Sequence, residues 1–175
     1  MREASPSTWV LWIHASSLFR FETSIRYILD DLRVKGRDEP KANIFQLLQR
    51  WLLNRTADNK WILILDGADN TGFLLESPFP ATSDAQKTGQ CPKRRIDYLP
   101  CCPHRSILVT TRSANAASPV VDQKNTIWVG PMDDSSAISL LQSRLGSEGG
   151  REDLAALVRN LGNLPLALTQ AASFI

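Results

Sequence analysis

The stretch WILILDGADN, residues 61–70, places five consecutive apolar residues directly before an acidic turn. Such a short apolar run, rich in strand-forming residues, is typical of a strand that is buried in a parallel sheet. Ligands of open parallel sheets bind outside the carboxyl ends of the strands. Asp66, which stands at this end, is therefore the first candidate for a binding site.

Strand and helix patterns alternate on both sides of this stretch. Three further apolar runs predict strands at 8–15, 106–111 and 125–130, and we expect the first, TWVLWIHA, to be buried on both faces. Apolar residues recur at helical spacing within 16–33 and 43–55, which predicts two helices. This alternation is typical of an α/β fold in which a parallel sheet has flanking helices.

The pattern changes after residue 130, where two helical segments follow with no further strand. We therefore expect an α/β domain over residues 1–130 and the start of a helical subdomain over residues 131–175. Within the first domain, residues 76–104 are rich in Pro, Ser, Thr and Lys with little periodicity. That composition predicts that most of this segment is a surface loop.

Composition and charge exclude several classes of protein. A net charge of +2, with 43% hydrophobic and 22% charged residues, predicts a globular chain without nucleic-acid or membrane partners. No apolar run approaches the roughly 18 residues of a membrane span, and the first residues lack a signal-peptide core. Both observations predict a cytoplasmic protein. The cysteines Cys91, Cys101 and Cys102 suit a reducing compartment; with His104 they could hold zinc, although the chain has no C-x-x-C pair.

The candidate site takes its chemistry from two strand ends. An apolar strand that ends in a carboxylate such as Asp66 is what a Walker B element looks like, because that carboxylate holds Mg²⁺ beside nucleotide phosphates. Alternatively, Asp66 only caps the next helix. The run SILVTTR carries Thr110, Thr111 and Arg112 at its end. A guanidinium there could hydrogen-bond a terminal phosphate; alternatively, Arg112 pairs with a surface carboxylate.

The ordered segments WILILDGADN, SILVTTRS, VGPMDDSSAISLL and LGNLPLALTQAASFI resemble the NB-ARC domain of the STAND class of P-loop NTPases. The chain is most similar to the fungal NB-ARC proteins that often carry tetratricopeptide repeats, because VLWIHASSLFRFETSIRYI resembles the segment after their P-loop helix. The resemblance implies a signalling switch that binds ADP or ATP with Mg²⁺. It implies other domains of the same full-length receptor as partners, and a homo-oligomer formed on activation as a further candidate.

The resemblance also implies roles for particular residues. Asp66 would bind Mg²⁺ and serve as a catalytic residue, Thr111 and Arg112 would bind the nucleotide with Arg112 sensing its terminal phosphate, and Pro165 would pack near adenine. Where the family often has a second acid after the Mg²⁺ carboxylate, this chain has Gly67. Asp69 is the candidate substitute in the catalytic role.

The phosphate-binding motif of the family is not in this sequence. The chain contains no G-x-x-x-x-G-K-[ST], and its only Lys followed by Thr or Ser, Lys87, lacks both glycines. We interpret the chain as a fragment that starts downstream of the P-loop, so that residues 1–130 are a partial nucleotide-binding domain. The family's strand order places the P-loop strand between 106–111 and 125–130. We therefore expect 125–130 to be detached or mispaired.

Three hypotheses of function follow from these residues. The first is an incomplete nucleotide-binding module of a STAND-type switch, which resembles an ATPase-type switch but lacks Walker A. The second is a nucleotide-independent protein-interaction scaffold derived from a P-loop NTPase fold, in which burial alone explains the apolar run. The third is an unrelated hydrolytic α/β enzyme with Asp66 and His14 in a cleft.

Overall fold

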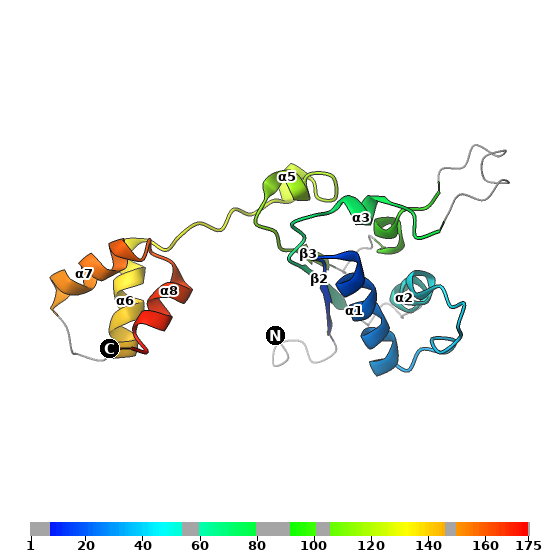
Figure 1. Cartoon of the computed structure of the whole chain (residues 1–175), viewed down its shortest axis with the longest axis horizontal. Coiled ribbons are helices and arrows are strands. Elements are labelled where there is room, and N and C mark those ends of the chain that lie inside the picture. Colours follow the sequence, from blue (N-terminus) through cyan, green and yellow to red (C-terminus); the bar gives the residue numbers. More distant parts are fainter. Residues whose placement is uncertain (1–7, 54–59, 80–91, 101–105, 146–149, 175) are drawn as a thin grey trace. The chain divides into compact units, whose positions relative to one another are not determined.

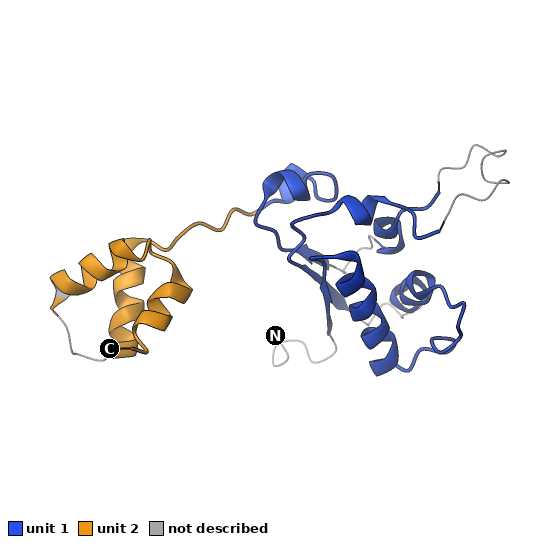
Figure 2. Cartoon of the chain, in the orientation of Figure 1, with its two compact units in different colours: residues 1–126 blue, residues 127–175 orange. Residues whose placement is uncertain are grey.

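The computed structural model describes residues 8–53, 60–79, 92–100, 106–145 and 150–174. The chain divides into two compact units, residues 1–126 and residues 127–175 (Figure 2). Each unit has its own cluster of buried apolar side chains.

A three-stranded parallel sheet forms the centre of the first unit (Figure 1). Its strands are β1 (Trp9–His14), β2 (Trp61–Asp66) and β3 (Ser106–Val109), in the order β1-β2-β3. The apolar runs of the sequence form these strands, and the sheet confirms the predicted α/β class. The register aligns Leu11 with Leu63 and Ile107, and it places His14 opposite Asp66.

Two helices cover one face of this sheet. They are α1 (Leu18–Asp31), which Ser17 caps by accepting a hydrogen bond from the Arg20 N–H, and α2 (Ile44–Leu53). Their apolar faces pack with alternate strand residues in one core, whose fully buried members include Ile13, Phe21, Ile25, Leu48, Leu52, Leu63 and Leu65. Each such side chain stabilises the fold by about 1.5–3 kcal/mol. This packing fixes the sheet that carries the candidate site.

The opposite face of the sheet is open among the described residues. Val10, Trp12 and Leu108 point to this face in the register, and each is about half exposed. The expectation that residues 8–15 are buried on both faces is therefore wrong. The physical reason is that α1 and α2 pack on the same side, so the alternate apolar side chains of β1 have no described helix to cover them.

The strand predicted at 125–130 does not form. The short 3₁₀ helix η2 (Gln123–Asn125) begins this segment, and Ile127, Trp128 and Val129 are 85, 81 and 87% exposed. A strand needs a neighbouring strand to satisfy its backbone groups, and no described strand pairs with these residues. The expectation of a detached or mispaired segment agrees with this in that residues 125–130 belong to none of the described strands.

Short helices complete the first unit: α3 (Gly72–Leu75) and η1 (Arg95–Tyr98) lie between β2 and β3, and α5 (Ala114–Ala117) follows β3. Within the predicted loop of residues 76–104, η1 buries Tyr98 against Phe45 of α2. The buried Arg95 donates from Nη1 to the carbonyl of Phe73 at 3.0 Å. The candidate zinc ligands Cys91, Cys101, Cys102 and His104 lie outside the described residues.

The second unit contains α6 (Asp134–Leu145), α7 (Arg151–Asn160) and α8 (Pro165–Ala171). Its core is made of Ala137, Leu141, Leu154, Val158 and Leu168. The side chain of Asp133 accepts the Ser136 N–H at 2.9 Å and so caps α6. None of the described helices combines the length and the apolar character that a membrane crossing requires.

Candidate functional site

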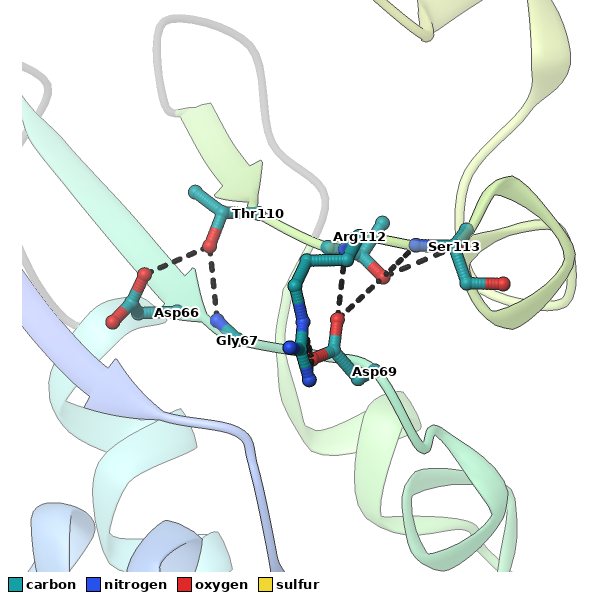
Figure 3. Close-up of polar contacts among 7 residues, drawn as sticks. Asp66, Gly67, Asp69, Thr110, Arg112 and Ser113 are labelled. Atoms are coloured by element: carbon teal, nitrogen blue, oxygen red, sulfur yellow. Dashed lines mark hydrogen bonds and ion pairs between the residues drawn. The ribbon is translucent and has the colours of Figure 1, made fainter. Parts of the chain in front are cut away.

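Polar side chains gather at the carboxyl ends of β2 and β3 (Figure 3). Backbone hydrogen bonds continue the pairing of these strands beyond their last residues. The Thr110 N–H donates to the carbonyl of Leu65 at 2.9 Å, and the Ala68 N–H donates to the carbonyl of Thr110 at 2.8 Å. The turns after the two strands are therefore held side by side, although they are more than 40 residues apart in the sequence.

Gly67 allows the chain to turn directly after β2. Its φ angle is +70°, in the left-handed region that side chains with a Cβ adopt only at a cost. An added Cβ would have space, since its nearest neighbour is the Ser16 Cβ at 3.9 Å, so the cost is conformational. This turn gives a physical reason why the acid that follows Asp66 stands at Asp69 and not directly after the strand.

Thr110 connects the two strand ends through its hydroxyl. It donates to Asp66 Oδ1 at 2.8 Å and accepts the Gly67 N–H at 2.9 Å. Asp66 itself remains 37% exposed. We did not assign a role to Thr110 from the sequence. The signal that would have found it is the parallel register, because Leu65 pairs with Val109 and the next residues are then neighbours.

His14 stands beside Asp66 on the other side, at the end of β1. The distance from His14 Nδ1 to Asp66 Oδ2 is 3.8 Å, which is too long for a hydrogen bond, and both side chains are open to solvent. The backbone N–H of His14 donates to Ser24 Oγ at 3.1 Å. The structure thus brings together the two residues of the hydrolytic hypothesis without an acid–base hydrogen bond between them.

Asp69 and Arg112 form an ion pair between the two turns. The carboxylate accepts the Arg112 backbone N–H at 2.7 Å through Oδ1 and the Nε–H at 2.7 Å through Oδ2, and Nη2 lies 2.6 Å from Oδ2. These hydrogen bonds, first the backbone one and then the side-chain one, lower the pKa of Asp69. A carboxylate with a lowered pKa is a weaker general base, so the geometry does not favour Asp69 for proton abstraction.

The hydroxyl of Thr111 belongs to the same turn. It lies 3.2 Å from Asp69 Oδ1 and 3.2 Å from the carbonyl oxygen of Ser113, and it accepts the Ser113 N–H at 3.1 Å. Ser113 in turn accepts the Ala116 N–H at the start of α5. Thr111 therefore shapes the turn that presents Arg112.

Pro165 belongs to the second unit, unlike the other candidates. Asp66, Asp69, Thr111 and Arg112 come together in the first unit, whereas Pro165 opens α8 in the second unit and is exposed there. A proline in the first turn of a helix loses no hydrogen bond within that helix. Its local role in the second unit is thus to begin α8.

The strand-end residues do not form a closed metal site on their own. Among the described residues, no group of three or more His, Cys, Asp and Glu side chains comes close enough together to hold a metal. Mg²⁺ is usually bound by one or two carboxylates, with waters and phosphate oxygens as its other ligands. The exposed carboxylate of Asp66 fits that pattern of partial coordination.

Comparison with known proteins adds one observation. No protein-family model matches the chain. The chain is similar to a protein of Hyaloscypha variabilis that is described as a nucleotide-binding leucine-rich repeat (NLR)-like protein. The two are 34% identical over 178 aligned positions, which cover the whole of this chain and 17% of that protein. The chain thus corresponds to about one sixth of an NLR-like protein's length.

Proposed function

We propose that this chain is part of the ADP/ATP-binding module of a STAND-type signalling switch of the NB-ARC kind. One observation carries the proposal: the carboxylate of Asp66 and the guanidinium of Arg112 follow two neighbouring parallel strands, at the edge of the sheet where ligands of such sheets bind. The similarity of the whole chain to an NLR-like protein supports the same function.

In this module Asp66 is the Mg²⁺ ligand. Its Oδ1 is oriented by the Thr110 hydroxyl, which leaves the second oxygen and the exposed side of the carboxylate for a hydrated cation. The metal, when bound, supplies positive charge beside the nucleotide phosphates and neutralises the charge that develops there. The Thr110 hydroxyl holds the carboxylate in place for that ligand and is itself fixed by the Gly67 N–H, which donates to it.

Arg112 is the phosphate-sensing residue. Its side chain is 90% exposed, and its pair with Asp69 involves only Nε and Nη2 of the guanidinium. The backbone cradle and lysine that hold the β- and γ-phosphates of P-loop proteins have no counterpart in this sequence. We therefore infer that a P-loop from elsewhere in a longer protein completes the phosphate site.

Calorimetric titration with ADP and ATP, with and without Mg²⁺, tests this function. We expect the 175-residue chain to bind either nucleotide with a Kd above about 10 μM, which corresponds to a binding free energy of about 7 kcal/mol. A version in which the strand, P-loop and helix of a P-loop NTPase precede Met1 should bind at least tenfold more tightly. Equal affinity of the two versions, or tight binding by the short chain, would contradict the proposal.

The nucleotide-independent scaffold is the second candidate function. The observation that favours it is the open apolar face of the sheet at Val10, Trp12 and Leu108, which suits burial against another protein surface. The same titration separates the two candidates. A P-loop-bearing version that is folded and binds no nucleotide would support the scaffold.

The proposed module would work inside a larger protein. An NLR-like relative about six times as long as the aligned region makes other domains of the same receptor the natural partners. We propose a cytoplasmic receptor that forms a homo-oligomer on activation. Hydrolysis requires a residue that orients water, and the pairing of Asp69 with Arg112 makes switching by nucleotide exchange the better-supported activity.

A further inference from the structure

We propose that Asp69 competes with phosphate for Arg112, so that the guanidinium rests on Asp69 until a polyphosphate displaces it. This inference rests on the proposed function, in which Arg112 senses the terminal phosphate. It adds to the phosphate-bound state of Arg112 a resting state in which the guanidinium is paired with Asp69. The affinity of the strand ends for an anion is then set by a competition between a carboxylate of this chain and the ligand.

The geometry of the pair supports a competition. Asp69 Oδ2 contacts Nε and Nη2, and this fork of parallel N–H groups is the arrangement with which arginine also binds phosphate oxygens. A phosphate that binds through this Nε–Nη2 edge must replace Asp69, because the edge is already occupied by the carboxylate. The carboxylate lies in the same chain, and its effective concentration is therefore high.

The exposure of the pair argues against a role in stability alone. Ion pairs in which one side chain is 90% exposed add little to the free energy of unfolding. The two turns are also joined by the Arg112 backbone N–H, which donates to Asp69 Oδ1, and by the Ala68 N–H, which donates to the Thr110 carbonyl; neither bond needs the guanidinium. The side-chain pair is thus free to open while the turns stay joined.

The local charges point in the same direction. Without a cation, Asp66 and Asp69 outnumber Arg112, and the strand ends carry a net charge of −1 by this count. Such a site repels a free phosphate. Removal of the Asp69 charge both releases the guanidinium and reverses part of that repulsion.

Asp69→Asn is the variant that separates these effects, because the asparagine Oδ1 can still accept the Arg112 backbone N–H. The 175-residue chain is titrated with inorganic triphosphate in four forms: wild type, Asp69→Asn, Arg112→Ala and the double variant. We expect Asp69→Asn to bind triphosphate about three- to tenfold more tightly than wild type. In the Arg112→Ala background the same substitution should change the affinity less than twofold.

Asp97→Asn is the matched control. Asp97 accepts both the backbone N–H and the Nε–H of Arg94, so this second pair has the same pattern away from the strand ends. Its removal adds the same unit of charge, and we expect a gain in triphosphate affinity below twofold. An equal gain for Asp97→Asn and Asp69→Asn would show a general effect of net charge and would overturn the proposal.

The Nε–H resonance of Arg112 in nitrogen-15 NMR spectra reports the pair without any ligand. We expect a slowly exchanging signal in the wild type that is lost in Asp69→Asn and shifts when triphosphate is added. An Nε–H signal that is the same in wild type and Asp69→Asn would overturn the competition. So would a gain in triphosphate affinity that persists in the Arg112→Ala background, or an Asp69→Asn variant that binds triphosphate more weakly than wild type. Failure of the proposed function appears elsewhere, as an ATP-to-ADP affinity ratio that Arg112→Ala leaves unchanged in the P-loop-bearing version.

Discussion

The end of β2 and the turn that follows it each carry one aspartate, and the two carboxylates have different surroundings. Among the described residues, the Asp66 carboxylate accepts one hydrogen bond, from Thr110, and it keeps an exposed side. Asp69, three residues later, is bound by the backbone and the guanidinium of Arg112. The same chemical group is therefore available to a cation at one position and committed to an arginine at the other. Hydrogen-bond partners, more than proximity to the strand end, decide the role.

The largest expected effect is the loss of Mg²⁺-dependent nucleotide affinity when Asp66 is replaced. In the P-loop-bearing version, Asp66→Ala should remove the Mg²⁺-dependent part of the nucleotide affinity, at least about tenfold or 1.4 kcal/mol, because the metal loses its protein ligand. Asp69→Ala should leave the Mg²⁺ dependence in place. Calorimetry with and without Mg²⁺ measures both, and Asp31→Ala, an exposed acid of α1, is the control. The comparison breaks if Asp66→Ala retains the full dependence on Mg²⁺.

The glycine between the two carboxylates should give the next largest effect. Gly67→Ala places a Cβ at a φ of +70°, and we expect the free energy of unfolding to fall by about 1–2 kcal/mol. Gly67→Asn should lose less, because asparagine tolerates the left-handed region better than alanine. Urea denaturation of the three proteins measures the difference. Equal stability of wild type and Gly67→Ala would show that the turn can adopt another conformation.

Removal of the Thr110 hydroxyl tests the hydrogen bonds that orient the Asp66 carboxylate. Thr110→Val loses the bonds to Asp66 Oδ1 and from the Gly67 N–H, and we expect a loss of about 1 kcal/mol in the free energy of unfolding. Thr110→Ser keeps the hydroxyl and should stay within about 0.5 kcal/mol of wild type. The same denaturation experiment tests this, and a valine variant as stable as the serine variant would contradict the assigned hydrogen bonds.

The smallest expected effect is the pH dependence of the stability that Asp69 contributes. The pKa of Asp69 is lowered in the folded protein, above all by the hydrogen bond from the Arg112 backbone N–H. Its contribution to stability is therefore fully present above the unfolded pKa of about 4 and is lost as the pH falls through the lower folded value. Melting temperatures between pH 2 and 6 should decrease less steeply toward acid for Asp69→Asn than for wild type. Parallel curves would mean that Asp69 is not held by Arg112 in solution.

Local sequence patterns predicted the three strands of the sheet and the helices α1 and α2. The run Trp61–Leu65 is short, apolar and β-prone, and its alternate residues are buried in β2. Periodicity could not predict which face of the sheet is covered, because an apolar side chain such as Trp12 indicates that burial is favourable and not that a neighbour is present. The same reason explains the exposed Trp128, whose β-forming neighbours predicted a strand that has no partner.

The candidate site was predictable in part. A carboxylate after one buried strand and a guanidinium after another identified Asp66 and Arg112, because the ends of parallel strands lie at one edge of a sheet. The partners of these residues depend on register and turn geometry between segments more than 40 residues apart. Thr110 and the pairing of Asp69 with Arg112 therefore became visible only in three dimensions.

Paramagnetic broadening by Mn²⁺ tests most directly whether the two carboxylates differ as described. The P-loop-bearing version is mixed with ADP, and Mn²⁺ is added in place of Mg²⁺. The amide signals of Gly67 and Thr110 are then followed by NMR. We predict that both signals broaden in wild type and in Asp69→Asn, and that both stay sharp in Asp66→Asn. Broadening that survives in Asp66→Asn and disappears in Asp69→Asn would place the cation on the other carboxylate and contradict the account.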